Sequence, residues 1–134
     1  GPDHPDTLAT RNNHATELGE VGEHAAAAAL FVSVAADRAR VLGPDHPDTL
    51  GARNNHAHYL GASGKFAAAA ALFADLAKDR ARVLGPDHPD TLGARNNHAY
   101  CLGKSGQPAA AAALFADLAK DRARVQGPDH PDTH

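Results

Sequence analysis

The chain repeats itself with a fixed period of 42 residues. Copies of the heptapeptide Gly-Pro-Asp-His-Pro-Asp-Thr begin at Gly1, Gly43, Gly85 and Gly127. Residues 43–84 and 85–126 differ at only six positions. A period of about 20–50 residues is typical of proteins whose repeats stack on their neighbours, because no single repeat can bury its apolar face alone. We therefore divide the chain into repeats 1–42, 43–84 and 85–126, followed by the start of a fourth repeat at 127–134.

The first half of each repeat has the pattern of a helix. In the first copy, Pro5 suits the first helical position, where its missing N–H would have no partner in any case. Leu8 and Ala15 follow at spacings that place them on one helical face. Gly22 is a typical residue at which a helix ends. The pattern predicts a helix over residues 5–21.

The second half of each repeat predicts a second helix. It begins at His24 or Ala25 and is rich in alanine, which has a high helix propensity. Gly43-Pro44 ends it, because proline cannot continue a helix. The positions expected on its buried face are Ala27, Leu30, Phe31, Val34, Val41 and Leu42. The predicted fold class is all-α, an α-solenoid of three helical hairpins with the start of a fourth repeat.

Composition argues against several classes of function. Thirteen basic and sixteen acidic residues give a formal net charge of −3, without the basic patch that a nucleic-acid-binding protein needs. No apolar run approaches the roughly 20 residues that a membrane-spanning helix requires. Cys101 is the only cysteine, so the chain has no intrachain disulfide and no cysteine-based zinc motif. We expect a cytoplasmic protein without cofactor, nucleic-acid or membrane partner.

The ten histidines invite a metal site, which the spacing does not favour. His14, His56 and His98 occur once per repeat, and packed helices lie about 8–10 Å apart, whereas zinc–nitrogen bonds are near 2 Å. We expect these three rings to be buried and neutral, and the histidines of the Asp-His-Pro-Asp turns to make local hydrogen bonds. Those turn histidines are His4, His46, His88 and His130. No nucleophile–base set or phosphate-binding glycine loop occurs, so no catalytic residue is predicted.

The small residues of each repeat resemble a known family. Asn12-Asn13-x-Ala15, followed by Gly22, Ala27 and Phe31, is similar to the tetratricopeptide repeat, in the 42-residue variety of kinesin light chains and bacterial arrays. The resemblance covers nearly the whole chain. It implies a right-handed superhelix whose first helices line a concave groove that binds peptides or proteins.

The chain departs from the family pattern at two positions of the first helix. Histidine follows the paired asparagines, where such repeats usually carry leucine. The bulky residue expected three positions later is kept only as Tyr59, and Glu17 and Cys101 stand in its place in the other two repeats.

The resemblance places two sets of candidate binding residues on the groove side of the first helices. The first set is a ladder of asparagines whose amides can bind a peptide backbone: Asn12, Asn13, Asn54, Asn55, Asn96 and Asn97. Alternatively, one asparagine per repeat hydrogen-bonds a neighbouring hairpin and fixes the stacking. The second set is the variable position Thr16, His58 and Tyr100, which sets specificity unless it has simply drifted on an exposed face.

An arginine precedes the asparagines in every repeat, at Arg11, Arg53 and Arg95. These guanidinium groups can contact an acidic peptide. They can equally pair with aspartates of the adjoining hairpin or lie along the alanine surface.

A solenoid without capping repeats leaves an apolar face at each end. Because residues 127–134 repeat the start of the chain, we expect head-to-tail self-association and a parent array that is longer. The function predicted from sequence is a non-enzymatic protein- or peptide-binding scaffold. Two alternatives stay open: the sensor or oligomerisation arm of a larger signalling NTPase, and an engineered or consensus-like array that is stable without a ligand.

Overall fold

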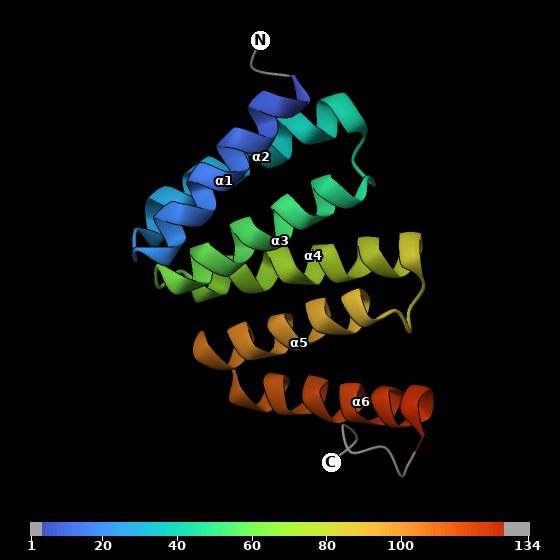
Figure 1. The fold of residues 1–134 in the computed structure, drawn as a ribbon. Coiled ribbons are helices and arrows are strands. Elements are labelled where there is room, and N and C mark those ends of the chain that lie inside the picture. Colours follow the sequence, from blue (N-terminus) through green and yellow to red (C-terminus); the bar gives the residue numbers. More distant parts are fainter. Residues whose placement is uncertain (1–3, 128–134) are drawn as a thin grey trace. The chain divides into compact units, whose positions relative to one another are not determined.

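The computed structural model describes residues 4–127, and every regular element within them is a helix (Figure 1). The helices are α1 (Pro5–Glu20), α2 (His24–Leu42), α3 (Pro47–Ala62), α4 (Phe66–Leu84), α5 (Pro89–Lys104) and α6 (Pro108–Gln126). They form one helical hairpin per repeat, which confirms the predicted all-α class. Beyond Gly127, the start of a fourth repeat lies outside the described residues. None of the described helices is both long and apolar enough to cross a membrane.

Within each hairpin a glycine ends the first helix, as predicted. Gly22 has a φ of 91°, a left-handed conformation that side chains disfavour. Here the chain turns back, and the Glu23 N–H donates to the carbonyl of Leu18 at 2.8 Å. This bond closes the turn in the manner of a Schellman motif. The same bond recurs in the other hairpins at 3.1 Å and 3.0 Å.

Between hairpins, the Asp-His-Pro-Asp-Thr turn starts the next helix. His46 is the N-cap of α3, Pro47 follows it, and the His46 Nδ1 accepts from the Asp48 N–H at 3.1 Å. The buried Thr49 hydroxyl donates to the Gly43 carbonyl at 2.9 Å, which ties the helix start to the preceding turn. Both bonds recur at α5, from the Asp90 N–H to the His88 Nδ1 and from the Thr91 hydroxyl to the Gly85 carbonyl. The predicted local hydrogen bonding is thus confirmed for His46 and His88, while His130 lies outside the described residues.

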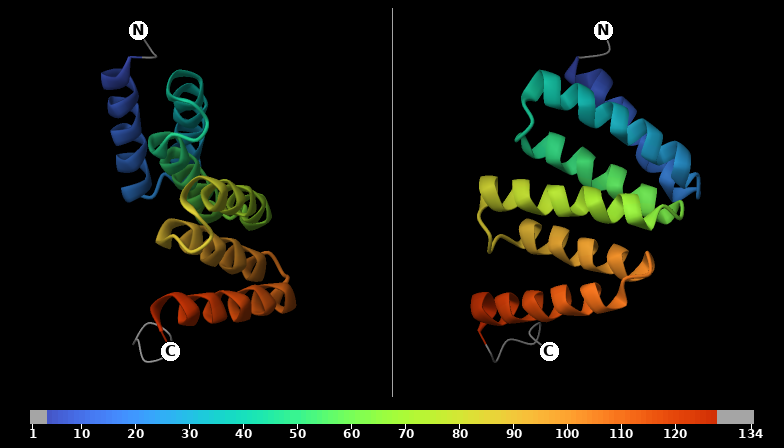
Figure 2. Two further views of the ribbon diagram at one scale, coloured as in Figure 1. Left: turned by 90° about the vertical axis from the view of Figure 1, so that its right-hand side faces the viewer. Right: turned by 180° about the vertical axis from the view of Figure 1, so that it is seen from behind.

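The chain divides into two compact units, one ending at Ala69 and the other beginning at Ala70, in the first turn of α4. In the N-terminal unit, α2 packs against both α1 and α3 (Figure 2). Small side chains allow close approach, as in the cluster of Val34, Ala35 and Ala52. The buried apolar residues of these three helices are Leu8, Ala15, Ala27, Ala28, Phe31, Val34, Ala35, Leu50, Ala52 and Ala57.

The expected buried face of α2 is correct for Ala27, Phe31 and Val34 and wrong for the last turn. Leu30 is half-buried, and Val41 and Leu42 are 40% and 37% exposed. The reason is length: α2 has 19 residues and α1 and α3 have 16 each, so the end of α2 has less helix beside it.

In the C-terminal unit, α5 packs against α6. Its buried apolar residues are Ala70, Phe73, Leu76, Ala77, Leu92, Ala94, Ala99, Cys101, Ala111 and Leu118. Only the last two come from α6, and Phe115 on this helix is 39% exposed.

Candidate functional site

The six asparagines lie on α1, α3 and α5, within reach of solvent. Asn13 is exposed and the other five are half-buried. Within residues 4–127, none of their side-chain amides takes part in a hydrogen bond. The amides therefore keep both donors and acceptors available to a ligand. The alternative role, a hydrogen bond that fixes the neighbouring hairpin, is not formed in the described part of the chain.

The variable position presents a different side chain on each first helix. The Thr16 hydroxyl donates to the Asn12 carbonyl of its own helix at 3.0 Å. His58 is exposed and meets the edge of the Tyr59 ring, with centroids 4.8 Å apart. Tyr100 is 51% exposed, with the Lys104 Nζ 5.6 Å from its ring centre. From the first repeat to the third, this position thus carries a hydroxyl, an imidazole, and a phenol with a cation beside it.

Arg11 and Arg95 are held in ion pairs within their own hairpin. The Arg11 Nη1 lies 2.6 Å from the Asp37 Oδ2, and its Nη2 donates to the Ser33 hydroxyl. The Arg95 Nη1 lies 2.7 Å from the Asp121 Oδ2. These two aspartates lie on the second helix of the same hairpin, whereas the pairing suggested from the sequence as one alternative was with the adjoining hairpin.

These ion pairs change the acidity of the aspartates. Hydrogen bonds from Arg11 and Arg40 lower the pKa of Asp37, and a hydrogen bond from Arg95 lowers the pKa of Asp121. Arg53, at the same position of the second repeat, is half-buried.

The repeated histidine does not have one environment. His14 is exposed, so its expected burial is wrong, whereas His56 and His98 are half-buried. Burial lowers the pKa of His56 and of His98. No three histidine, cysteine, aspartate or glutamate side chains gather in the described residues in a way that could hold a metal ion. Burial also raises the pKa of the Cys101 thiol, which disfavours its nucleophilic thiolate form.

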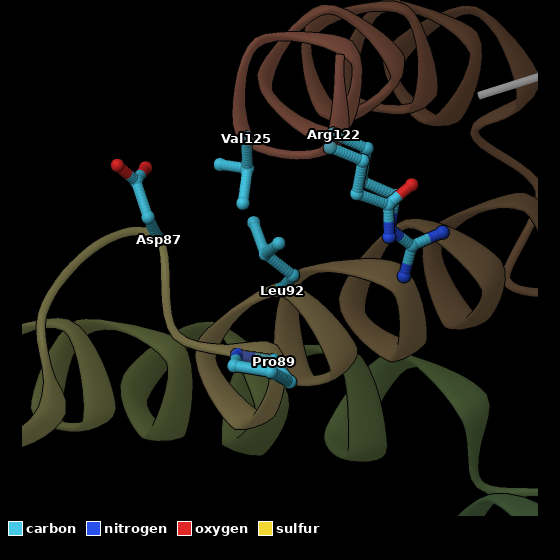
Figure 3. Close-up of a pocket in the computed structure, with 6 residues that line it drawn as sticks. Asp87, Pro89, Leu92, Arg122 and Val125 are labelled. Carbon is cyan, nitrogen blue, oxygen red and sulfur yellow. The ribbon is translucent and has the colours of Figure 1, made fainter. Parts of the chain in front are cut away.

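The C-terminal unit has two hollows that sequence reasoning missed. One, of about 300 Å³, lies between α4 and α5; Ala74, Ala77 and Ala81 form one side, and Arg95 and His98 lie opposite. The other, of about 430 Å³, lies between the start of α5 and the end of α6 (Figure 3). There Val125 and Leu92 point toward one another, and Arg122 extends from α6. Asp87 beside it accepts two hydrogen bonds from Arg124, at 2.9 Å and 2.7 Å.

The repeat itself contains a signal for the second hollow. Arg122 is the third copy of Arg38 and Arg80. The Nη1 of Arg38 lies 3.4 Å from the backbone carbonyl oxygen of Asp48. In the next repeat, the Nη1 of Arg80 lies 3.5 Å from the backbone carbonyl oxygen of Asp90. Each of these carbonyls belongs to the start of the following first helix. Arg122 therefore lies at the position whose counterparts in the first two repeats contact the start of the following first helix.

The two ends of the array differ. Thr10, His14 and Glu17 make the outer side of α1 polar and exposed. On α6 the exposed residues include Ala112, Phe115 and Ala119. Among the described residues, these exposed side chains are thus apolar on α6 and polar on α1.

Comparison with known proteins agrees with this architecture. The sequence pattern described as tetratricopeptide repeat matches residues 7–48, 49–90 and 91–132, with the same 42-residue period. A solved Podosopora anserina protein with nearly identical TPR-like repeats, described as a kinesin light chain, is 25% identical, with a TM-score of 0.84 over 95% of this chain and 60% of its own. A single-substitution variant of that protein is also 25% identical, with a TM-score of 0.83 over 94% of this chain and 59% of its own.

The chain spans about 60% of the length of these solved proteins. No curated protein matches it. The matched repeats and the paired helices together show that the chain belongs to the tetratricopeptide repeat family and has the fold of a helical solenoid with three repeats of two helices.

Proposed function

We propose that the chain is a non-enzymatic scaffold that binds peptide through the first helices of its repeats, α1, α3 and α5. Tetratricopeptide repeats in general mediate protein–protein contacts. The observation that carries the proposal for this chain is the asparagine ladder, whose amides are accessible and make no hydrogen bond within residues 4–127. An amide can donate and accept at once, so a repeated ladder can bind a peptide backbone whatever its side chains.

Specificity in this proposal comes from Thr16, His58 and Tyr100. Each lies one helical turn after the first asparagine of its repeat, so the two sets share a region of the helix surface. The ladder supplies affinity that is similar in every repeat, and the variable position tells one peptide from another. Tyr100 contributes most, because an exposed aromatic ring offers large contact area at low entropy cost.

The arginines act as positioning residues in this account. Arg11 and Arg95 each clamp a first helix to the second helix of the same hairpin, directly beside the asparagines. Arg53 occupies the equivalent position in the second repeat. Exchanging an arginine is therefore expected to shift the neighbouring amides as well as to remove a charge.

A selection with a random peptide library, displayed on phage and panned against the whole chain, tests the scaffold. The affinity of an enriched peptide is then measured by fluorescence polarisation against the wild type and the variant Asn12→Ala/Asn54→Ala/Asn96→Ala. We expect a loss of at least about 10-fold, because several amide hydrogen bonds to the peptide disappear together. The matched control is Asp75→Asn/Asp117→Asn, exposed on α4 and α6 and expected to bind as the wild type does.

Equal affinity for the wild type and the asparagine variant would remove the ladder from the binding site. A selection that enriches no peptide would favour the other readings, an array without ligand or an arm of a larger signalling NTPase.

A second candidate function is self-association through the two ends of the array. The observation that favours it is the apolar surface of α6, where Phe115 is 39% exposed and Val125 is 44% exposed. Large apolar side chains that stay exposed are common at protein–protein contact surfaces.

A further inference from the structure

The last turn of each first helix carries a different charge in each repeat. The position is Glu20 in α1, Ala62 in α3 and Lys104 in α5. All three residues are exposed, so the exposure of this position does not follow from the place of a repeat in the array. The charge changes from negative through neutral to positive, although the second and third repeats differ at only six positions in all.

This position shares a helical face with the residues assigned above to peptide binding. It follows the variable position by four residues, a spacing that places two side chains next to one another on a helix. In α5 the two side chains lie together, with the Lys104 Nζ 5.6 Å from the centre of the Tyr100 ring. A peptide side chain that reaches this exposed ring therefore also reaches the ammonium group.

Neither charge is neutralised within residues 4–127. The Glu20 carboxylate takes part in no hydrogen bond or ion pair there, and Lys104 has the Tyr100 ring beside it but no carboxylate. On the second helices the situation differs, because Asp37 and Asp121 are both paired with arginines. The charges at the ends of α1 and α5 are thus available to a ligand.

The helix dipole accounts for the lysine but not for the glutamate. The carboxyl end of a helix carries a partial negative charge, so a cation is favourable there and an anion is unfavourable. Lys104 lies in the last turn of α5, whereas the last turn of α1 contains no basic residue and ends at Glu20. Glu20 therefore opposes the dipole of its own helix. Residues that conflict with their local structure in this way are expected at functional sites.

We propose that Glu20 and Lys104 select the charge of the peptide side chain beside the variable position, a basic one at α1 and an acidic one at α5. The inference rests on the proposed function and deepens it. The asparagines bind the backbone, Thr16 and Tyr100 contact the side chain, and the residue one turn further on accepts or rejects its charge. Repulsion of the wrong charge contributes to specificity as much as attraction of the right one. At α3, Ala62 makes no such selection.

Parallel phage selections test the inference without a known ligand. One random peptide library is panned against the wild type, Glu20→Lys and Lys104→Glu, and the enriched peptides are sequenced. Each variant places at one helix end the residue that the other helix carries there. We expect Glu20→Lys to shift the enriched peptides toward acidic residues and Lys104→Glu to shift them toward basic residues. The matched control, Lys78→Glu at an exposed position of α4, is expected to enrich the same peptides as the wild type.

An acidic peptide enriched on the wild type then measures the size of the effect. Its affinity, and that of a copy in which the acidic residue is lysine, is determined by fluorescence polarisation. We expect Lys104→Glu to bind the acidic peptide about 5-fold more weakly than the wild type does, and to bind the lysine copy more tightly. Both differences are expected to shrink in about 0.5 M salt, because the charges are exposed. Circular dichroism checks that each variant is folded.

The outcomes separate this inference from the proposed function. Peptides that need the asparagine ladder but have the same charge composition for the wild type, Glu20→Lys and Lys104→Glu would overturn the inference and leave the scaffold in place. An equal shift with Lys78→Glu would also overturn it, because the net charge of the chain would then explain the result. A selection that enriches no peptide would refute both.

Discussion

Tyr59 shows how a single side chain ties together the three helices of the N-terminal unit. Its ring stacks on Phe31 and, at 6.0 Å, on His24, both of α2. Gly19 of α1 also lies against the ring, because a Cβ atom added there would come within 2.3 Å of it. The family resemblance predicted a bulky residue at this position. The glycine that makes room for it lies 40 residues away in the sequence, and only the packed hairpins reveal the pairing.

Two glycine substitutions test this contact. Gly19→Ala is expected to lower the free energy of unfolding by about 1–3 kcal/mol, because the methyl group cannot enter without displacing Tyr59. Gly51→Ala on α3 is the matched control. A Cβ there meets nothing within 4 Å, so the higher helix propensity of alanine is expected to raise the free energy of unfolding by about 0.5–1 kcal/mol. Urea denaturation measures both, and changes of the same sign would contradict the packing described for Tyr59.

The half-buried histidines predict how stability depends on pH. Burial lowers the pKa of His56 and His98 from the ordinary value of 6.5, so the unfolded chain takes up protons at a higher pH than the folded chain does. Stability is therefore full above pH 6.5 and falls as the pH drops from there toward the lowered folded values. The three ion-paired aspartates have pKa values lowered from 3.8, so the stability that they contribute is lost only at a more acidic pH.

The expected result is a loss of unfolding free energy between about pH 7.5 and pH 5, measured in urea at each pH. His56→Gln/His98→Gln is expected to flatten this dependence, because the titrating rings are gone. His14→Gln, at the exposed copy of the same position, is the matched substitution and is expected to retain the slope. A melting temperature that does not change between these pH values would refute the role given to the two half-buried rings.

The helices themselves were largely predictable, because the residues that begin and end them act on their own backbone. Pro47 favours the first position of α3, and Gly22 allows the left-handed turn after α1. The predicted range 5–21 differs from the observed α1 by one residue. Contacts between helices were less predictable. Arg11 and Asp37 are 26 residues apart, and their pairing depends on how the hairpin closes rather than on any local pattern.

The turn between hairpins carries a bond that can be tested at the level of the element. Thr49→Val removes the hydroxyl that donates to the Gly43 carbonyl, in a residue that is 1% exposed. We expect a loss of about 1–2 kcal/mol in the free energy of unfolding, because the carbonyl is left without this donor. Thr16→Val is the control. Its hydroxyl bonds a carbonyl of its own helix, so the change is expected to stay within about 0.5 kcal/mol. Equal costs would mean that the turn does not depend on Thr49.

At the scale of the whole molecule, the repeat made the architecture predictable and concealed the differences between copies. His14, His56 and His98 each follow Arg-Asn-Asn and precede Ala, yet only the first is exposed. Phe73 and Phe115 likewise share their local sequence, residues 67–83 and 109–125, and differ in burial. The same limit applies to the asparagine ladder, whose amides have the same neighbours along the sequence whether or not a ligand binds them. What surrounds a residue in such an array depends on which copies flank it.

Phenylalanine provides the most direct test of that statement. Phe31→Ala and Phe73→Ala remove side chains that are 0% and 2% exposed, so each is expected to cost about 3–5 kcal/mol of unfolding free energy. Phe115→Ala is the same change in a local sequence identical to that around Phe73. Because this ring is 39% exposed, we expect a cost of about 1 kcal/mol. If the first two variants do not fold, the milder Phe→Leu series is expected to give the same order in urea. A third-repeat cost equal to the other two would mean that each hairpin holds its own phenylalanine, and that neighbouring repeats do not share one core.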